Sequence, residues 1–232
     1  PFDFKRHQWA GALDWKWRAL PIKRSQLPEL VPAGSPLGVI SAQAAQQTGI
    51  PEGLPLISAG ADKACEVLAS GCLTPDTGSL SYGPTATYNS TNTRYAEAIR
   101  HVPAYPAAMP GAYNTETIVQ RGYWMVNWFK REFGLRETHL AAQLGVETGT
   151  LLKQVPAGSM GLTVQPYWSP GVRIPGPEAK GAIIGFGDVH TRAHIYRAII
   201  EGLAYALREG KERLEKRSGH AIKTLKVSGG GS

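Results

Sequence analysis

The sequence is poor in cysteine: Cys65 and Cys72 are its only two among 232 residues. Two thiols are too few for a disulfide framework, and they are wrongly grouped for a zinc site. The chain also lacks an apolar run of about eighteen residues, which a membrane-spanning helix requires. Its start shows no basic-apolar-small pattern of a secretory signal. These absences exclude a disulfide-stabilised exported protein and predict a soluble, cytoplasmic one without membrane contact.

The chain carries a net charge of +7, and basic residues gather near its start together with tryptophans. This basic, aromatic region contains Lys5, Arg6, Trp9, Trp15, Lys16, Trp17, Arg18, Lys23 and Arg24. Basic residues interleaved with aromatics are typical of nucleic-acid surfaces. The same composition fits a solvated basic face over inward-packed tryptophans, or a surface that attracts small anions such as nucleotides. No nucleic-acid-binding signature accompanies the charge, so we expect no nucleic-acid partner.

Both ends of the sequence look internal. The first residue is Pro1 rather than Met, and the last four are Gly229, Gly230, Gly231 and Ser232. We therefore expect a fragment of a longer protein. The alternative is that the glycine-rich ending is an artificial linker.

The stretch from Leu54 to Lys63 is the most informative one. Its apolar first half, residues 54–58, has the length and composition of a buried strand, and Gly60 permits a sharp turn after it. Asp62 then stands where a helical pattern begins, so backbone N–H groups at a helix N-terminus favour its ionised carboxylate. Taken alone, this aspartate fits a helix cap. In a cleft it is a candidate catalytic base.

Strands and helices alternate along the rest of the chain, which predicts a layered α/β domain. The expected helices are residues 42–48, 122–133, 137–144, 149–155 and about 191–219; the expected strands lie within 78–91, 162–167, 181–186 and 224–228, with a loop at 168–180. Residues 78–91 are rich in hydroxyls and bend at a glycine, which fits a phosphate-holding turn or an ordinary polar hairpin. Gly202 and Gly210 weaken the longest helix, so we expect close packing against a neighbouring backbone there.

Several motifs together resemble the FGGY family of carbohydrate kinases. The longest is Gly181–Phe186 followed by His194–Glu201, which is similar to the C-terminal signature of the family except that Phe186 replaces a usual aliphatic residue. Gly60-Ala61-Asp62-Lys63 resembles the family's Gly-x-x-Asp element, whose aspartate is the catalytic base. Asp62 and its neighbour Lys63 are then the implied substrate-binding residues.

The resemblance also implies nucleotide-binding residues. Gly83 and Thr85 resemble the family's phosphate-contacting turn, with Pro84 a departure at the usual threonine. Gly229 and Gly230, after a strand, resemble its adenosine-contacting glycine pair, which argues against a linker. Gly122 and Asn127 are similar in position to its nucleotide-contacting glycine and amide.

The resemblance implies an α/β, actin-like (ribonuclease H-like) fold, with the end of the first domain in residues 1–53 and an incomplete C-terminal kinase domain in residues 54–232. It implies a carbohydrate kinase that uses ATP and Mg²⁺ to phosphorylate a sugar or polyol, such as a pentulose. A homodimer is one assembly that such a kinase can form. Lys63 stands where related kinases carry an amide, so a more acidic polyol or a solvent-facing lysine is expected.

Two other functions stay open at this point. A nucleotide hydrolase or chaperone can share the actin-like fold, because a fold alone does not fix chemistry. A non-catalytic module could instead use the basic, aromatic region to bind nucleic acid, and its binding would weaken steeply with salt.

Overall fold

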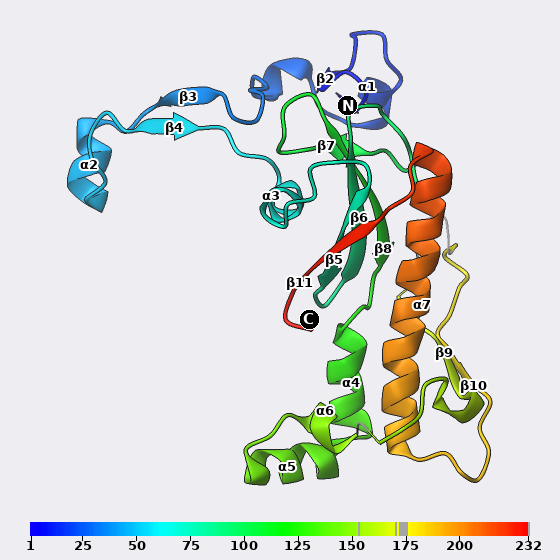
Figure 1. Ribbon diagram of the computed structural model, residues 1–232. Coiled ribbons are helices and arrows are strands. Elements are labelled where there is room, and N and C mark those ends of the chain that lie inside the picture. Colours follow the sequence, from blue (N-terminus) through cyan, green and yellow to red (C-terminus); the bar gives the residue numbers. More distant parts are fainter. Residues whose placement is uncertain (153, 170, 172–175, 232) are drawn as a thin grey trace.

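The computed structural model describes residues 1–152, 154–169, 171 and 176–231. A five-stranded mixed sheet lies at its centre, in the order β11-β5-β6-β8-β7 (Figure 1). Its strands are β5 (Thr77–Tyr82), β6 (Ala86–Asn92), β7 (Tyr105–Pro106), β8 (Tyr113–Val119) and β11 (Thr224–Ser228). β11 runs parallel to β5, and the other neighbours pair antiparallel.

Shorter strands and the helices surround this sheet in the described part of the chain. Two-stranded sheets are formed by β1 (Phe2–Asp3) with β2 (Gln8–Trp9), β3 (Pro36–Val39) with β4 (Pro55–Ile57), and β9 (Thr163–Gln165) with β10 (Ala182–Ile184). The helices are α1 (Lys16–Ala19), α2 (Ala42–Thr48), α3 (Asp62–Ala69), α4 (Trp124–Glu132), α5 (Leu135–Leu144), α6 (Thr148–Leu151) and α7 (Arg192–Ser218). Two 3-10 turns, Arg24–Gln26 and Ser159–Gly161, complete the elements.

Most of the expected elements are present. Helix 42–48 begins and ends as predicted, since Ser41 Oγ accepts the N–H of Ala44 at 3.3 Å and Gly49 ends it with φ of 75°. Gly219 ends α7 in the same left-handed conformation. The prediction of a helix at 149–155 is wrong in extent, because α6 stops at Leu151. Strand β8 was not predicted at all.

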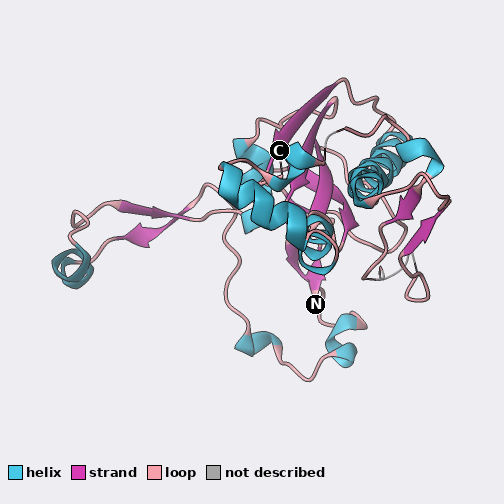
Figure 2. Ribbon diagram, turned by 90° about the horizontal axis from the view of Figure 1, so that it is seen from below, coloured by secondary structure: helices cyan, strands magenta, loops and turns pink. Residues whose placement is uncertain are grey.

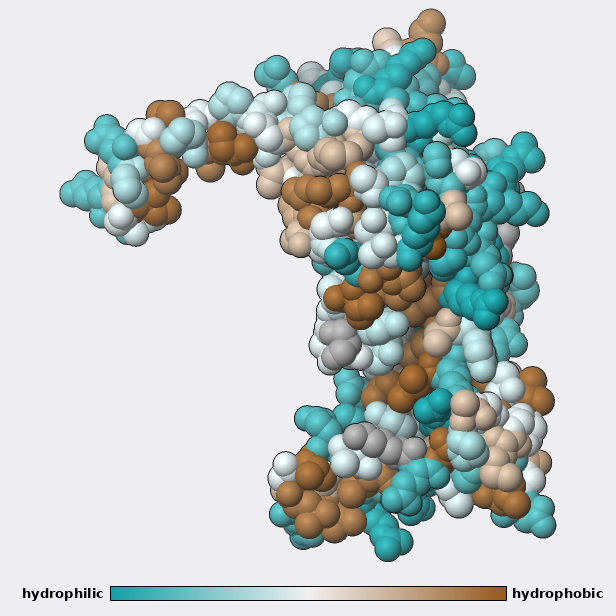
Figure 3. All heavy atoms as spheres, in the orientation of Figure 1, coloured by the Kyte–Doolittle hydropathy of each residue, from teal (hydrophilic) through white to brown (hydrophobic). Residues whose placement is uncertain are grey.

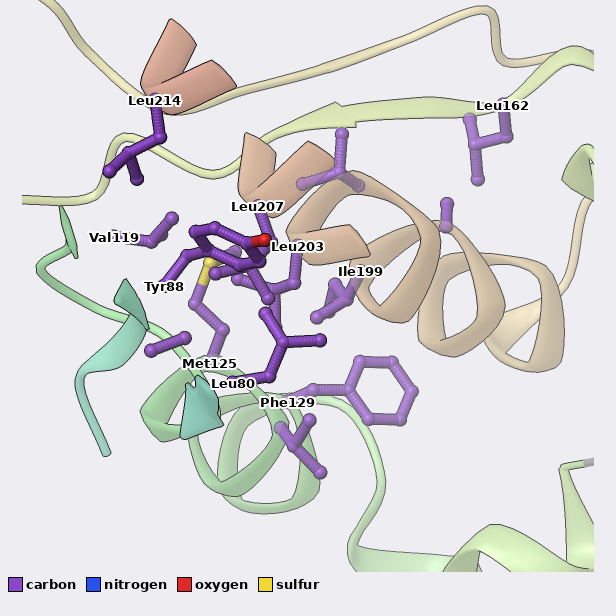
Figure 4. Close-up of a cluster of buried hydrophobic side chains, with 14 of the residues drawn as sticks. Leu80, Tyr88, Val119, Met125, Phe129, Leu162, Ile199, Leu203, Leu207 and Leu214 are labelled. Atoms are coloured by element: carbon purple, nitrogen blue, oxygen red, sulfur yellow. The ribbon is translucent and has the colours of Figure 1, made fainter. Parts of the chain in front are cut away.

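The long helix α7 covers one face of the sheet and buries the main apolar core (Figure 4). Leu80 of β5 and Tyr88 of β6 meet Ile199, Leu203 and Leu207 of α7 in this core. The two helix glycines are the points of closest approach. A Cβ at Gly202 would collide with the backbone carbonyl of Val164 on β9, and a Cβ at Gly210 with the Thr117 side chain. The expected close contact with a backbone is therefore confirmed at Gly202, while a side chain fills the space at Gly210.

The opposite face of the sheet is polar. Strand pairing places Ser79, Ser81, Thr87, Asn89, Thr91, Asn114 and Glu116 together on it. We call this set the polar face. Helix α3 lies over part of it, where the Ser70 hydroxyl after the helix donates to Ser79 Oγ at 3.1 Å. Successive side chains of a strand point to opposite faces of a sheet. The alternation along β5, β6 and β8 therefore places the apolar core on one face and the polar face on the other.

Residues 36–57 form an arm that projects away from the sheet (Figures 1 and 2). It consists of the β3–β4 ribbon with α2 at its tip. The apolar side chains on it stay exposed, as the brown surface of the arm shows (Figure 3). Ile57, for example, is 50% exposed. The prediction of a buried strand at 54–58 is therefore wrong: β4 pairs only with β3 in the described residues, and no second layer covers either strand there.

The tryptophans of the basic, aromatic region are partly used for packing. Trp9 Nε1 donates to the Pro28 carbonyl at 3.0 Å, and Trp17 Nε1 donates to the Gly11 carbonyl at 2.9 Å. Trp15 stays exposed. Two of the three indoles are thus hydrogen-bonded within the chain and partly buried, and none of the three lies in the core. Among the described residues, no helix is long and apolar enough to cross a membrane.

Candidate functional site

Asp62 begins helix α3 directly after the turn at Gly60, as the sequence predicts. The helix cap is Ala61, which has no side-chain hydrogen bond, so Asp62 is not the capping residue. Its Oδ1 accepts the N–H of Lys63 at 2.7 Å, and the side chain is otherwise exposed. The carboxylate is therefore open to solvent and to a ligand at the first turn of α3.

A pocket of about 760 Å³ opens beside this corner. It is lined by residues from the corner, from the sheet and from the N-terminal region, among them Arg6, His7, Gly60, Lys63, Tyr105 and Glu116. Asp62 itself stands at the edge of the pocket rather than in its wall, while both of its chain neighbours line it. The pocket is large enough for a molecule of sugar size.

A hydrogen-bonded network on the polar face forms one wall of this pocket. Asn89 Nδ2 donates to Glu116 Oε1 at 3.2 Å, and the Tyr105 hydroxyl donates to Asn89 Oδ1 at 2.8 Å. Desolvation raises the pKa of the Glu116 carboxyl, and it outweighs the opposing effects of the Asn89 hydrogen bond and the nearby Lys63 charge. Glu116 therefore gives the pocket a carboxyl whose second oxygen can bind a hydroxyl group.

Lys63 also lines the pocket, but its charge is already paired. Its Nζ lies 2.5 Å from Glu66 Oε2, one turn further along α3. The other oxygen of Glu66 accepts the Ser228 hydroxyl at 2.8 Å, at the end of β11. A continuous set of contacts thus runs from the Asp62 corner to the last residue before the C-terminal glycines.

Four of the six predicted nucleotide-binding residues lie at the sheet end where β5 and β11 finish. Gly83 follows β5, and its carbonyl accepts the N–H of Tyr123, next to Gly122. Gly229 follows β11 with φ of 98°, and the N–H of Gly231 donates to the Tyr82 carbonyl at 3.1 Å. The structure thus brings Gly83, Gly122, Gly229 and Gly230 into one neighbourhood.

Gly122, Gly229 and Gly230 differ in the space around them. A Cβ at Gly122 would collide with the backbone of Ala86, and a Cβ at Gly229 would approach the backbone of Tyr82. A Cβ at Gly230, by contrast, would meet no described atom within 4 Å. Gly122 and Gly229 are therefore required by the fold, while Gly230 leaves open space of the kind that a ligand needs for close approach.

The other two predicted nucleotide-binding residues are less directly placed. Thr85 begins the strand side of the turn, and its hydroxyl donates to the Gln120 carbonyl at 3.2 Å. Asn127 lies exposed on α4, one turn beyond the Gly83–Tyr123 contact. Thr85 thus fixes the turn within the chain, and the Asn127 side chain is accessible on the surface of α4.

The fold and this site together define a class of protein. Two glycine turns lie at one end of a mixed sheet, and a helix that begins with a carboxylate is hydrogen-bonded to the same sheet end through Glu66 and Ser228. Residues 78–232 match the C-terminal domain of the FGGY family of carbohydrate kinases. The chain belongs to this family.

Individual relatives agree with this assignment. The chain is 27% identical over 235 residues to a xylulose kinase of Lactococcus lactis, covering 99% of this chain and 44% of that protein. It is similar to the crystal structure of xylulose kinase from Rhodospirillum rubrum, with a TM-score of 0.73, 31% identity, and coverage of 90% and 41% of the two chains. Plasmodium falciparum glycerol kinase with ADP shares the fold, with a TM-score of 0.76 at 16% identity, over 99% of this chain and 44% of that one.

These comparisons confirm the predicted family and the actin-like fold. They do not favour the nucleotide hydrolase or the nucleic-acid-binding module. The chain spans less than half the length of the curated relatives that it matches.

Two residues of the site were not found from the sequence. Glu116 lies on β8, which was missed because Tyr113–Val119 carries few apolar residues, although the alternation of its Tyr, Thr and Val residues with Asn114 and Glu116 is a strand pattern. Glu66 lies inside α3, where a charged residue fits an ordinary solvated face. Its separation of three residues from Lys63 was the available signal, because such pairs meet on a helix.

Proposed function

We propose that this chain supplies the catalytic base and the nucleotide-binding wall of a kinase that transfers the γ-phosphoryl group of ATP to a hydroxyl of a ketose or other polyol. The observation that carries the proposal is the contact from Lys63 through Glu66 to Ser228, which joins the Asp62 corner to the C-terminal glycines. Phosphoryl transfer depends mainly on holding two reactants in line. A base and a nucleotide loop that share one rigid support meet that need.

Each predicted residue has a role in this proposal. The exposed Asp62 carboxylate, at the first position of α3, accepts the proton of the attacking hydroxyl. The turns at Gly83 and Gly229 would border the phosphates, and the open space at Gly230 would leave room for the adenosine. Thr85 and Gly122 hold the turn and the start of α4, and the exposed amide of Asn127 on α4 would be free to reach the nucleotide.

Two charged residues of the pocket, Lys63 and Glu116, favour a neutral polyol over an acidic one, while Arg6 is the cation of the same lining that would suit an acidic one. Lys63, the residue that suggested an acidic substrate, is neutralised by Glu66. Glu116 adds a carboxyl to the same wall, which suits hydroxyl donors and repels a substrate carboxylate. Two relatives named above are xylulose kinases, so a pentulose is the first substrate to test.

Magnesium fits this site only through the nucleotide. Among the described residues, no group of three or more His, Cys, Asp or Glu side chains could hold a metal ion. Mg²⁺ is commonly held by substrate phosphates with one or two carboxylates. It would neutralise phosphate charge, and Asp62 at the start of α3 is the exposed carboxylate that we propose for the site.

The division of the chain follows from the same proposal. Residues 1–53 would close the first domain and connect it to the second, and residues 54–232 would form the kinase domain that carries the site. The arm at residues 36–57 crosses the proposed boundary, so β4 would begin the second domain while still paired with β3.

A coupled ADP-release assay of the natural protein that contains this sequence tests the proposed function. The panel should include ketopentoses, ketohexoses, glycerol, other polyols and an aldonic acid. We expect ADP release that depends on a neutral polyol, with a pentulose among the active ones. ADP release independent of any acceptor would instead support a nucleotide hydrolase. Activity confined to the aldonic acid would contradict the assignment of a neutral substrate.

A further inference from the structure

Glu66 contacts two separate segments of the site, which is not expected of a residue that only belongs to a solvated helix face. One carboxylate oxygen pairs with Lys63 at 2.5 Å, and the other accepts the hydroxyl of Ser228 at 2.8 Å. Lys63 directly follows Asp62 in the chain, and Ser228 directly precedes Gly229. The two oxygens of a single side chain are thus bonded to the immediate neighbours of the proposed base and of the proposed adenosine-contacting glycines.

A third segment of the site also reaches this carboxylate. Desolvation raises the pKa of Glu66, but hydrogen bonds from Lys63, Ser81 and Ser228 outweigh it, so the pKa lies below its ordinary value. Ser81 is the next-to-last residue of β5, two positions before Gly83. Glu66 is therefore held ionised at the junction of α3, β5 and β11, and each partner borders a different segment of the proposed site.

We propose that Glu66 is a positioning residue that holds the polyol side and the nucleotide side of this site in register. The inference rests on the function proposed above and deepens it. When Lys63 is fixed by Glu66, the first turn of α3 and the Asp62 carboxylate are fixed with it. When Ser228 is fixed by the same carboxylate, the start of the glycine turn cannot move independently of the base. A displacement of about 1 Å between reacting groups already slows an enzyme greatly.

Glu215 offers a matched control. It also sits on a helix, pairs with a lysine, Lys211, at 2.6 Å, and accepts a hydrogen bond from the segment that leads to β11, the N–H of Ile222 at 2.7 Å. It tethers the beginning of β11, whereas Glu66 tethers the end that carries the glycines. Loss of an ion pair and a strand tether is therefore common to both variants, while Glu66 alone also contacts Ser81 and borders the site.

The experiment measures kcat, the KM for ATP and the KM for the best polyol in the natural protein, together with ADP affinity by calorimetry. For Glu66→Ala we expect the KM for ATP and the ADP dissociation constant to rise at least about tenfold, as for loss of a hydrogen bond to a charged group, and kcat to fall by a similar factor. Glu66→Gln keeps an acceptor for Ser228 but loses the charge facing Lys63. It should therefore restore nucleotide affinity while kcat stays low.

Glu215→Ala should lower the melting temperature about as much as Glu66→Ala and leave the kinetic constants within about twofold of the wild type. The double variant Glu66→Ala/Ser228→Ala should bind ADP no more weakly than Glu66→Ala alone, because both changes remove the same bond. Equal kinetic effects of the Glu66 and Glu215 variants would overturn the positioning role. A wild-type protein that turns over no polyol but binds ADP would overturn the kinase function, while the ADP affinities would still decide whether Glu66 holds the glycine turn.

Discussion

The proposed base is most directly tested by Asp62→Asn in the natural protein that contains this sequence. Asparagine has the shape of aspartate and retains an oxygen that can accept the Lys63 N–H, the bond that Asp62 makes at 2.7 Å. It cannot accept the proton of the attacking hydroxyl. Assistance by a general base contributes about 10² to 10⁴ in rate, so we expect kcat to fall by at least about a hundredfold.

The expected effect on stability is small and follows from the exposure of the side chain. Asp62 is exposed and is not the helix cap, so the change removes only its interaction with the dipole of α3. That interaction contributes about 0.3–1 kcal/mol at an exposed site. A loss of about 1 kcal/mol lowers the melting temperature of a domain of about 150–250 residues by about 2–4 °C, and that of a longer protein by less.

Steady-state kinetics and a thermal melt of the same preparation separate the two effects. Asp76→Asn is the matched control, because Asp76 is also an exposed aspartate with a local bond, from Thr74 Oγ1, and it precedes β5 at the end away from Gly83. We expect it to keep normal turnover. If Asp62→Asn melts far below the wild type and keeps its turnover, the carboxylate is structural and the assignment of the base is wrong.

Three further substitutions test other parts of the structure. Gly230→Val should raise the KM for ATP about tenfold or more and leave that for the polyol nearly unchanged, because the added side chain meets open space in this chain and would obstruct only a ligand. Gly202→Ala should destabilise the protein by about 1–3 kcal/mol in a thermal melt, because its Cβ would overlap the Val164 carbonyl. Tyr88→Phe should leave the melting temperature unchanged or raise it, because the buried hydroxyl has no hydrogen-bond partner among the described residues.

For each of these three predictions, one measurement could give a contradicting result. Equal increases in both KM values would show that Gly230→Val distorts the site as a whole. Gly210→Ala should cost less than Gly202→Ala, because it meets the rotatable Thr117 side chain instead of a backbone atom, and the reverse order would refute the packing argument. Tyr105→Phe, which loses a hydrogen bond to Asn89, should be the more destabilising tyrosine change.

Local sequence signals predicted most of the helices. Ser41 and Gly49 bound α2 because capping and left-handed termination depend on single residues. The position of Asp62 at a helix start was predicted for the same reason. The exposure of β4 could not be predicted from the sequence. An apolar run shows that a strand can be buried, but it does not show whether another layer packs against it.

The interior of the site depends on pairings between distant strands. Asn89 and Glu116 meet because β6 and β8 pair in one register, and no feature near either residue specifies that register. Likewise, Glu66 and Ser228 are 162 residues apart in sequence, and they meet only because β11 returns beside β5. The motifs therefore located the segments of the site, while the side chains that connect those segments required the tertiary structure.

The projecting arm has a consequence for how this protein opens. A two-stranded ribbon is marginally stable in water by itself, and β3 and β4 have only each other as strand partners among the described residues. Their amide hydrogens should therefore exchange with deuterium through local opening. The exchange rates should not depend on the global free energy of unfolding. The amides of α7, packed across the sheet, should exchange only when the whole domain unfolds, so the same chain would report two separate stabilities.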